Sequence, residues 1–86
     1  MSNQEAKQYY QQAYDLLTAE PEKSPHDKAL MMELLFNWAL LLYDFGDFNT
    51  LLDLFSSHES MAESVDDKPI RGMFKAWLGF AYYAKG

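Results

Sequence analysis

The chain contains no cysteine. This absence excludes disulfides, thiolate metal ligands and cysteine nucleophiles together. The chain has only two histidines. His26 and His58 are far apart in the sequence, and neither has a second histidine at helical spacing. A zinc site built from imidazoles needs such spacing. We therefore expect no metal ion and no cofactor.

Acidic residues outnumber basic ones in this chain. Seven Lys and Arg face thirteen Asp and Glu, and the net charge is −6 at pH 7. This sign opposes the electrostatic attraction that dominates binding to DNA, RNA and anionic lipid. Neither nucleic acid nor a membrane surface is expected as a partner.

Long apolar runs and catalytic motifs are missing too. No uninterrupted apolar segment is longer than Trp38–Tyr43, whereas a membrane-spanning helix needs roughly 20 residues. The first residues show no basic region followed by an apolar one, so no signal peptide is visible and a cytoplasmic location is expected. The sequence has no phosphate-binding glycine loop, serine elbow, His-Glu-x-x-His motif or calcium loop. We expect no enzymatic activity and no catalytic residue.

What the sequence does contain is apolar and aromatic. Of 86 residues, 49% are hydrophobic and 16% are aromatic. This composition favours a folded chain over a disordered one. The length indicates one small domain over 1–86, close to the size at which a hydrophobic core suffices without disulfides or metals.

Apolar residues recur every three to four positions and favour an all-α fold. Helices are expected over about 4–19, 25–45, 47–64 and 69–85. The second is apolar nearly all round, so we expect a central helix with neighbours on more than one side. The third contains the polar stretch 56–60 and is expected to fray there. The first carries one apolar stripe, made of Ala6, Tyr9, Tyr10, Ala13, Leu16 and Leu17.

Breaks and capping residues separate these helices. The segment 20–25 interrupts the chain with two prolines, and Ser24 is expected to cap the second helix. Gly46 is expected to end that helix in the left-handed conformation, and Asp47 to cap the next one. The segment 66–69 is another cap followed by a proline.

The chain also repeats itself. Shifted by 40 positions, the second predicted helix lies on the fourth, with Ala39 on Gly79 and glycine on glycine at the ends. Shifted by 45 positions, the first lies on the third, with Tyr10 on Phe55. This second match is the weaker one. Such self-similarity is typical of repeated helical hairpins.

These residues resemble the tetratricopeptide-repeat (TPR) family. Trp77–Gly86 is similar to the end of that family's first helix, with Leu-Gly, a tyrosine and a closing glycine at fixed offsets. Glu5–Ala13 is similar to its second helix, and Gly46–Phe48 resembles the turn between the two. The resemblance implies a TPR-like fragment of an α-solenoid. Its parts would be the second helix of one repeat, one full hairpin over 25–64 and the first helix of the next repeat.

Other helical architectures remain alternatives. The offsets of 40 and 45 exceed the family's usual period of about 34 residues, which leaves a HEAT-like or irregular helical bundle open. The aromatic-rich composition is also similar to helical-repeat regions that follow ATPase modules in large bacterial signalling proteins. That likeness would make the chain a regulatory segment of a longer protein.

The resemblance further implies a partner-binding groove. In this family the first helices line a concave surface that holds an extended peptide or a helix, and an asparagine sometimes grips the ligand backbone. Such a groove would be apolar with acidic edges and would suit an apolar or basic segment of a partner protein. The same residues could equally form core. Carried over by position, the groove has ten residues: Glu33, Phe36, Asn37, Leu40, Tyr43, Asp44, Met73, Trp77, Phe80 and Tyr83.

Self-association is the alternative function. Apolar residues surround the predicted helix 69–85, whereas terminal repeats normally present a polar outer face. Each large apolar side chain left exposed forgoes about 1.5–3 kcal/mol. We therefore expect a homo-oligomer that covers this helix by two-fold pairing or helix exchange, and that glutamate at Trp77 or Phe80 would dissociate. A small secretion chaperone of the same repeat family is a further reading within the binding class.

Overall fold

A computed structural model describes residues 3–19 and 24–86. Within these ranges the chain is helical and has no strand, which confirms the all-α class. Of the predicted break over 20–25, residues 20–23 lie outside the described residues. The helices are α1 (Asn3–Thr18), α2 (Pro25–Phe45), α3 (Phe48–Ser56), α4 (Glu59–Glu63) and α5 (Lys68–Lys85). Three of the four predicted helices are therefore confirmed to within one residue at each end.

The predicted capping residues account for the helix ends. The Ser24 hydroxyl accepts a hydrogen bond from the amide of Asp27 at 3.2 Å. Gly46 adopts a left-handed φ of 70°, and the Asp47 carboxylate accepts from the amide of Thr50 at 3.2 Å. Each cap satisfies backbone groups that have no partner inside the helix. The position of α2 and the start of α3 are thus confirmed.

The third predicted helix, 47–64, is wrong as a single helix. It is divided into α3 and α4 by Ser57 and His58. The Ser57 hydroxyl donates to the Asp53 carbonyl at 2.6 Å, and Nδ1 of His58 donates to the Leu54 carbonyl at 2.8 Å. Polar side chains of this kind compete with the backbone for its own acceptors. The predicted fraying is in fact a helix end followed by a new short helix.

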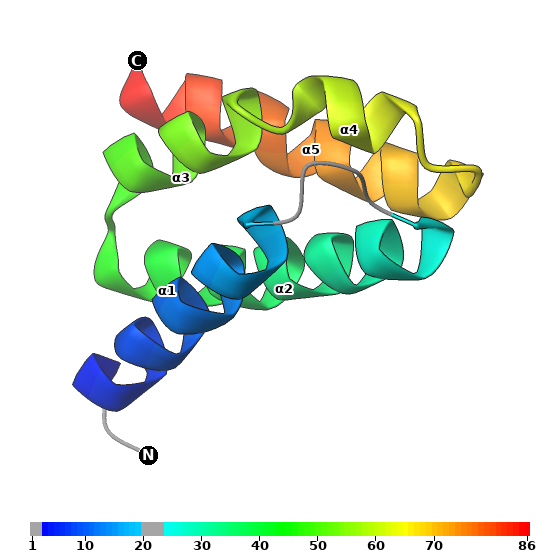
Figure 1. The fold of residues 1–86 in the computed structure, drawn as a ribbon. Coiled ribbons are helices and arrows are strands. Elements are labelled where there is room, and N and C mark those ends of the chain that lie inside the picture. The colour runs from blue at the N-terminus through cyan, green and yellow to red at the C-terminus, as the bar shows by residue number, and fades with distance from the viewer. Residues whose placement is uncertain (1–2, 20–23) are drawn as a thin grey trace.

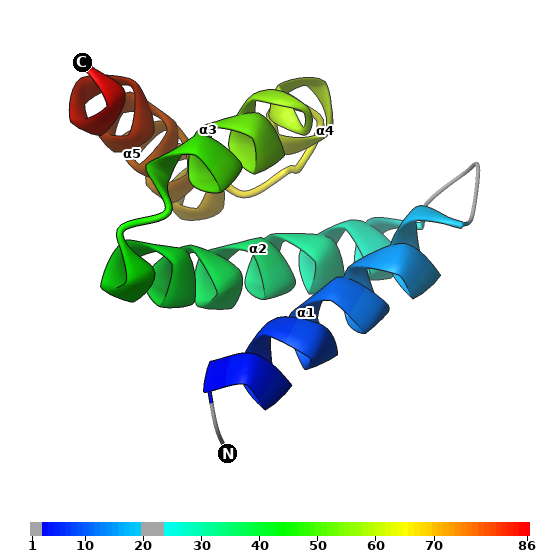
Figure 2. The same ribbon diagram turned by 90° about the vertical axis from the view of Figure 1, so that its left-hand side faces the viewer.

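α2 lies between the other helices. α1 crosses one side of it, and α3 and α5 lie on the opposite side (Figure 2). α3 packs along α5, and the short α4 contacts both α2 and α5 (Figure 1). The all-round apolar sequence of α2 follows from this placement, because α2 needs a buried row on each side.

The larger part of the core lies between α2, α3 and α5. The ring of Phe55 stacks on Phe74 with centroids 4.9 Å apart, and it lies 6.5 Å from Phe36 and 6.4 Å from Trp77. The aliphatic residues around these rings have no exposed surface. They are Met31, Met32, Leu35, Leu42 and Leu51.

The smaller part of the core lies between α1 and α2. The rings of Tyr10 and Tyr14 pack on Trp38 at 6.4 and 5.6 Å. Leu16, which was predicted in the apolar stripe of this helix, is 75% exposed. The stripe is therefore narrower than predicted, since α1 has a neighbour on one side and the far edge of its apolar row faces solvent.

The helix boundaries repeat at the offsets found in the sequence. Shifted by 45 positions, α1 covers 48–63, which runs from the first residue of α3 to the last residue of α4. Shifted by 40, α2 covers 65–85, and α5 is Lys68–Lys85. α1 packs on α2, and α3 packs on α5. Two helix pairs with similar boundaries, α1 with α2 and α3–α4 with α5, therefore follow one another in the chain.

We predict that Phe55→Ala lowers the free energy of unfolding by about 3–5 kcal/mol, because it opens a cavity at the centre of the core. Urea denaturation followed by circular dichroism measures the change. Phe45→Ala is the matched control, since Phe45 is 44% exposed, and it is expected to cost much less. Equal losses in the two variants would contradict this core.

Two glycine substitutions should have opposite signs. Gly46→Ala is expected to lower the free energy of unfolding by about 1 kcal/mol, because alanine is strained in the left-handed conformation. Gly79→Ala is expected to raise it by about 0.5–1 kcal/mol, because Gly79 lies inside α5. A Cβ at Gly79 would meet no atom within 4 Å. Thermal denaturation measures both, and a stabilising Gly46→Ala would refute the assigned helix end.

Candidate functional site

Six of the ten residues predicted to bind a partner lie in one row along α2. They recur at spacings of three and four residues, and helix geometry places such positions on one face. Phe36 is half-buried and the other five are exposed. The row consists of Glu33, Phe36, Asn37, Leu40, Tyr43 and Asp44.

The remaining four lie on α5, and aromatic contacts join two of them to α2. The ring centroid of Tyr43 is 5.5 Å from Phe80 and 6.5 Å from Trp77. Phe36 and Met73 line a common hollow further along the same two helices. We call the surface formed by Phe36, Tyr43, Met73, Trp77 and Phe80 the α2–α5 seam.

Two hollows open on the seam. One, of about 240 Å³, is lined by Tyr43, Trp77 and Phe80. The other, of about 470 Å³, is lined by Glu33, Phe36, Asn37 and residues of α5. Met73 lines both and is 52% exposed, so the hollows adjoin. Together they form an apolar surface long enough to take more than one side chain of a ligand.

The structure brings seven of the ten predicted residues to these hollows, and three lie elsewhere. Leu40 lies on α2 between Asn37 and Tyr43 and is 56% exposed. Asp44 lies near the end of α2, and Tyr83 near the end of α5 is 84% exposed. No hollow of the seam includes these three side chains.

The seam also contains the two residues predicted to mediate self-association. Trp77 and Phe80 are half-buried and contact Tyr43. They therefore do not lie on the side of α5 that points away from the core, which carries Lys75 and Gly79 instead. A glutamate at either aromatic position would disturb the seam in addition to any contact between copies.

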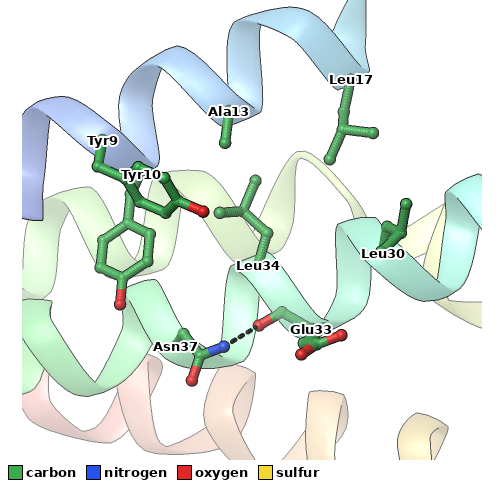
Figure 3. Close-up of a pocket in the computed structure, with 8 residues that line it drawn as sticks. All are labelled: Tyr9, Tyr10, Ala13, Leu17, Leu30, Glu33, Leu34 and Asn37. Atoms are coloured by element: carbon green, nitrogen blue, oxygen red, sulfur yellow. Dashed lines mark hydrogen bonds between the residues drawn. The ribbon is translucent and has the colours of Figure 1, made fainter.

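Charge is distributed unevenly across the seam. Glu33 and Asp44 are exposed acids on α2, whereas α5 has no acidic residue. The amide of Asn37 donates from Nδ2 to the Glu33 carbonyl oxygen at 3.0 Å (Figure 3). Its Oδ1 has no hydrogen-bond partner within the part of the chain that the structure describes, and it remains able to accept a hydrogen bond.

A third hollow, which the sequence reasoning missed, lies between α1 and α2. It measures about 250 Å³ and adjoins the seam through Glu33 and Asn37. Figure 3 shows side chains of the two helices pointing toward each other across it. We call it the α1–α2 groove. Its lining is Tyr9, Tyr10, Ala13, Leu17, Leu30, Glu33, Leu34 and Asn37.

Among the described titratable residues, His58 has contacts within the fold. Nδ1 of His58 donates to the Leu54 carbonyl, and the ring centroids of His58 and Tyr14 are 5.3 Å apart. These contacts hold the His58 ring just after the end of α3. Among the described residues, no group of three or more His, Cys, Asp or Glu could hold a metal ion. The hollows of the seam present apolar surface, with the acidic Glu33 at one of them.

Comparison with known proteins adds nothing to this geometry, because no family model, no curated protein and no solved structure matches the chain. None of the helices in the described ranges is both long enough and apolar enough to cross a membrane. Function is therefore inferred from the surfaces themselves.

Tyr14 should make stability depend on pH in alkali. Burial raises the pKa of its phenol above the ordinary value, and the nearby Asp15 carboxylate raises it further. Its contribution to stability is thus complete below the unfolded pKa of about 10 and is lost as pH rises through the folded pKa. We predict a smaller alkaline loss of stability in Tyr14→Phe than in the wild type, measured by urea denaturation between about pH 9 and 11. An identical loss in both would refute this role.

Proposed function

We propose that this chain is a non-enzymatic protein-interaction module that holds a peptide or helix of a partner protein along the α2–α5 seam. The observation that supports this most directly is the exposure of Tyr43 and Met73, which line two adjoining hollows. Contiguous exposed apolar surface of this kind is typical of interaction sites. Nucleic acid and membranes are not proposed as partners, because the chain is acidic.

We further propose that the module has a TPR-like arrangement. The two helices that line the seam, α2 and α5, correspond to each other at an offset of 40. In the family that the sequence resembles, the first helices of successive repeats line the binding surface in the same way. The pairing of α1 with α2 and of α3 with α5 supports a stack of alternating second and first helices.

The chemistry of the seam defines the partner. Apolar side chains of the ligand would enter the two hollows, with Met73 between them. Lys or Arg beside those residues would face Glu33 and Asp44 on the α2 edge. Oδ1 of Asn37 would accept a hydrogen bond from a backbone amide of the ligand. The proposed partner is therefore an apolar segment with basic residues on one side.

Peptide selection tests this proposal. Peptides are selected from a random phage-displayed library against the wild-type chain, and their affinities are measured by fluorescence polarisation. Met73→Ala and Tyr43→Ala are each expected to weaken binding by about tenfold or more, because they remove central apolar contacts. Leu16→Ala is the matched control, since Leu16 is 75% exposed on α1 and lies outside the seam.

The charge of the selected peptides provides a second readout. We expect enrichment of Lys and Arg next to apolar residues, and weaker binding to Glu33→Lys and Asp44→Lys. The loss should shrink at high salt, because exposed charges are screened. Selected peptides that bind Met73→Ala as tightly as the wild type, or that are acidic, would contradict the proposal.

A further inference from the structure

The α1–α2 groove is the counterpart of a groove that the chain itself fills. At offsets of 45 and 40, α1 corresponds to α3 with α4, and α2 corresponds to α5. The surface between α1 and α2 therefore corresponds to the surface between α3 and α5. Within the chain that second surface is covered by α2, with the Phe36 ring 6.5 Å from Phe55. The first has no such covering helix among the described residues.

The helix that corresponds to α2 is α5, and the matching side of α5 is free. On α2 the fully buried positions include Met32, Leu35, Ala39 and Leu42. On α5 the corresponding positions are all exposed. We call these positions the outer face of α5, which consists of Gly72, Lys75, Gly79 and Tyr82.

We propose that the outer face of α5 docks into the α1–α2 groove of a second copy of the chain, in the place that α2 takes against α3 and α5 within one copy. This contact uses none of the five residues that define the seam, although Glu33 and Asn37 line both the groove and a hollow of the seam. It goes beyond the function proposed above.

The register of the contact pairs two side chains that otherwise stay exposed. Within one copy, Tyr43 packs on Phe80 with ring centroids 5.5 Å apart. In the proposed contact, α5 of one copy takes the place of α2, and α2 of the other copy takes the place of α5. Tyr83 then stands where Tyr43 does and Leu40 where Phe80 does, so Tyr83 of one copy packs on Leu40 of the other. Tyr83 is 84% exposed and Leu40 is 56% exposed, and neither lies in a hollow of the seam. Docking would cover both of them.

The two surfaces are complementary in shape and charge. Gly72 and Gly79 have no side chain, and a Cβ on either would meet no atom within 4 Å, so the groove's large residues can approach the α5 backbone. α5 carries three lysines and one arginine and no acidic residue, although the whole chain has a net charge of −6. The lining of the groove includes the carboxylate of Glu33 and no basic residue, so the basic charges of α5 favour docking there. The same charges disfavour the pairing of two α5 helices.

This contact joins two different surfaces, so it is heterologous. Each copy in a pair retains one free groove and one free outer face. Association would therefore continue head to tail into an open chain or a ring and would not stop at a two-fold dimer. This differs from the symmetric pairing that the sequence alone favoured.

The test uses two variants that each block one surface. Gly79→Glu adds bulk and negative charge to the outer face, at a helical position where any residue other than glycine and proline favours the helix. The double variant Tyr9→Glu, Leu30→Glu places two carboxylates in the groove, at side chains that are already exposed. Lys85→Glu controls for a negative charge on α5 outside the outer face, and Leu16→Glu controls for a charge on α1 outside the groove.

Sedimentation velocity and light scattering measure the assembly at concentrations up to about 1 mM. The wild type and both controls are expected to form dimers and then larger species. Each blocked variant alone is expected to associate at least about tenfold more weakly, because it lacks one of the two surfaces. An equimolar mixture of the two blocked variants is expected to form a 1:1 dimer and nothing larger.

Three results would overturn the proposal. They are a wild type that stays monomeric throughout, a Gly79→Glu variant that dimerises by itself, and a mixture of folded blocked variants that does not associate. Circular dichroism establishes folding, and if the double variant were unfolded, the wild-type and Gly79→Glu arms would still decide the outcome. Peptide binding at the seam is measured separately, so failure here leaves the proposed function intact.

Discussion

Apolar side chains on two sides of α2 have to be covered at once. Five residues of this helix have no exposed area, and most of them lie toward α3 and α5. Trp38, on the other side, is packed under α1. Helices of 16 and 9 residues, the lengths of α1 and α3, have little stability alone in water. Both depend on burial against α2 or α5 for their order. The seam and the groove exist because α2 is shared between two pairs of helices.

Local chemistry made most of the fold predictable. The caps at Ser24, Gly46 and Asp47 depend on residues within four positions of each other, so the sequence contains all the information that fixes those ends. The division at Ser57 and His58 was missed because it depends on hydrogen bonds from these side chains to the backbone carbonyls four residues earlier. Periodicity treats these residues only as weak helix formers, and it gives no sign of such hydrogen bonds.

The candidate site was predictable to the extent that it follows helical spacing. Counting back from Gly46 placed the row on α2 correctly, since one helix face is fixed by a period of 3.6 residues. Leu40 and Tyr83 fall on the predicted helices but outside the hollows, because a hollow depends on how neighbouring helices cross. The α1–α2 groove was missed for the same reason, as its lining combines two helices. The offsets of 45 and 40 contained its signal, because they relate this groove to one that is filled.

The shared position of α2 is tested most directly by amide hydrogen exchange, measured residue by residue by NMR. Buried amides of α2 should exchange last, through global unfolding, together with those of α3 and α5 that pack on it. Amides of α1 should exchange earlier, because α1 packs mainly on α2 and can detach while the rest stays folded. Protection of α1 equal to that of α2, or loss of protection in α3 and α5 before α1, would contradict the account.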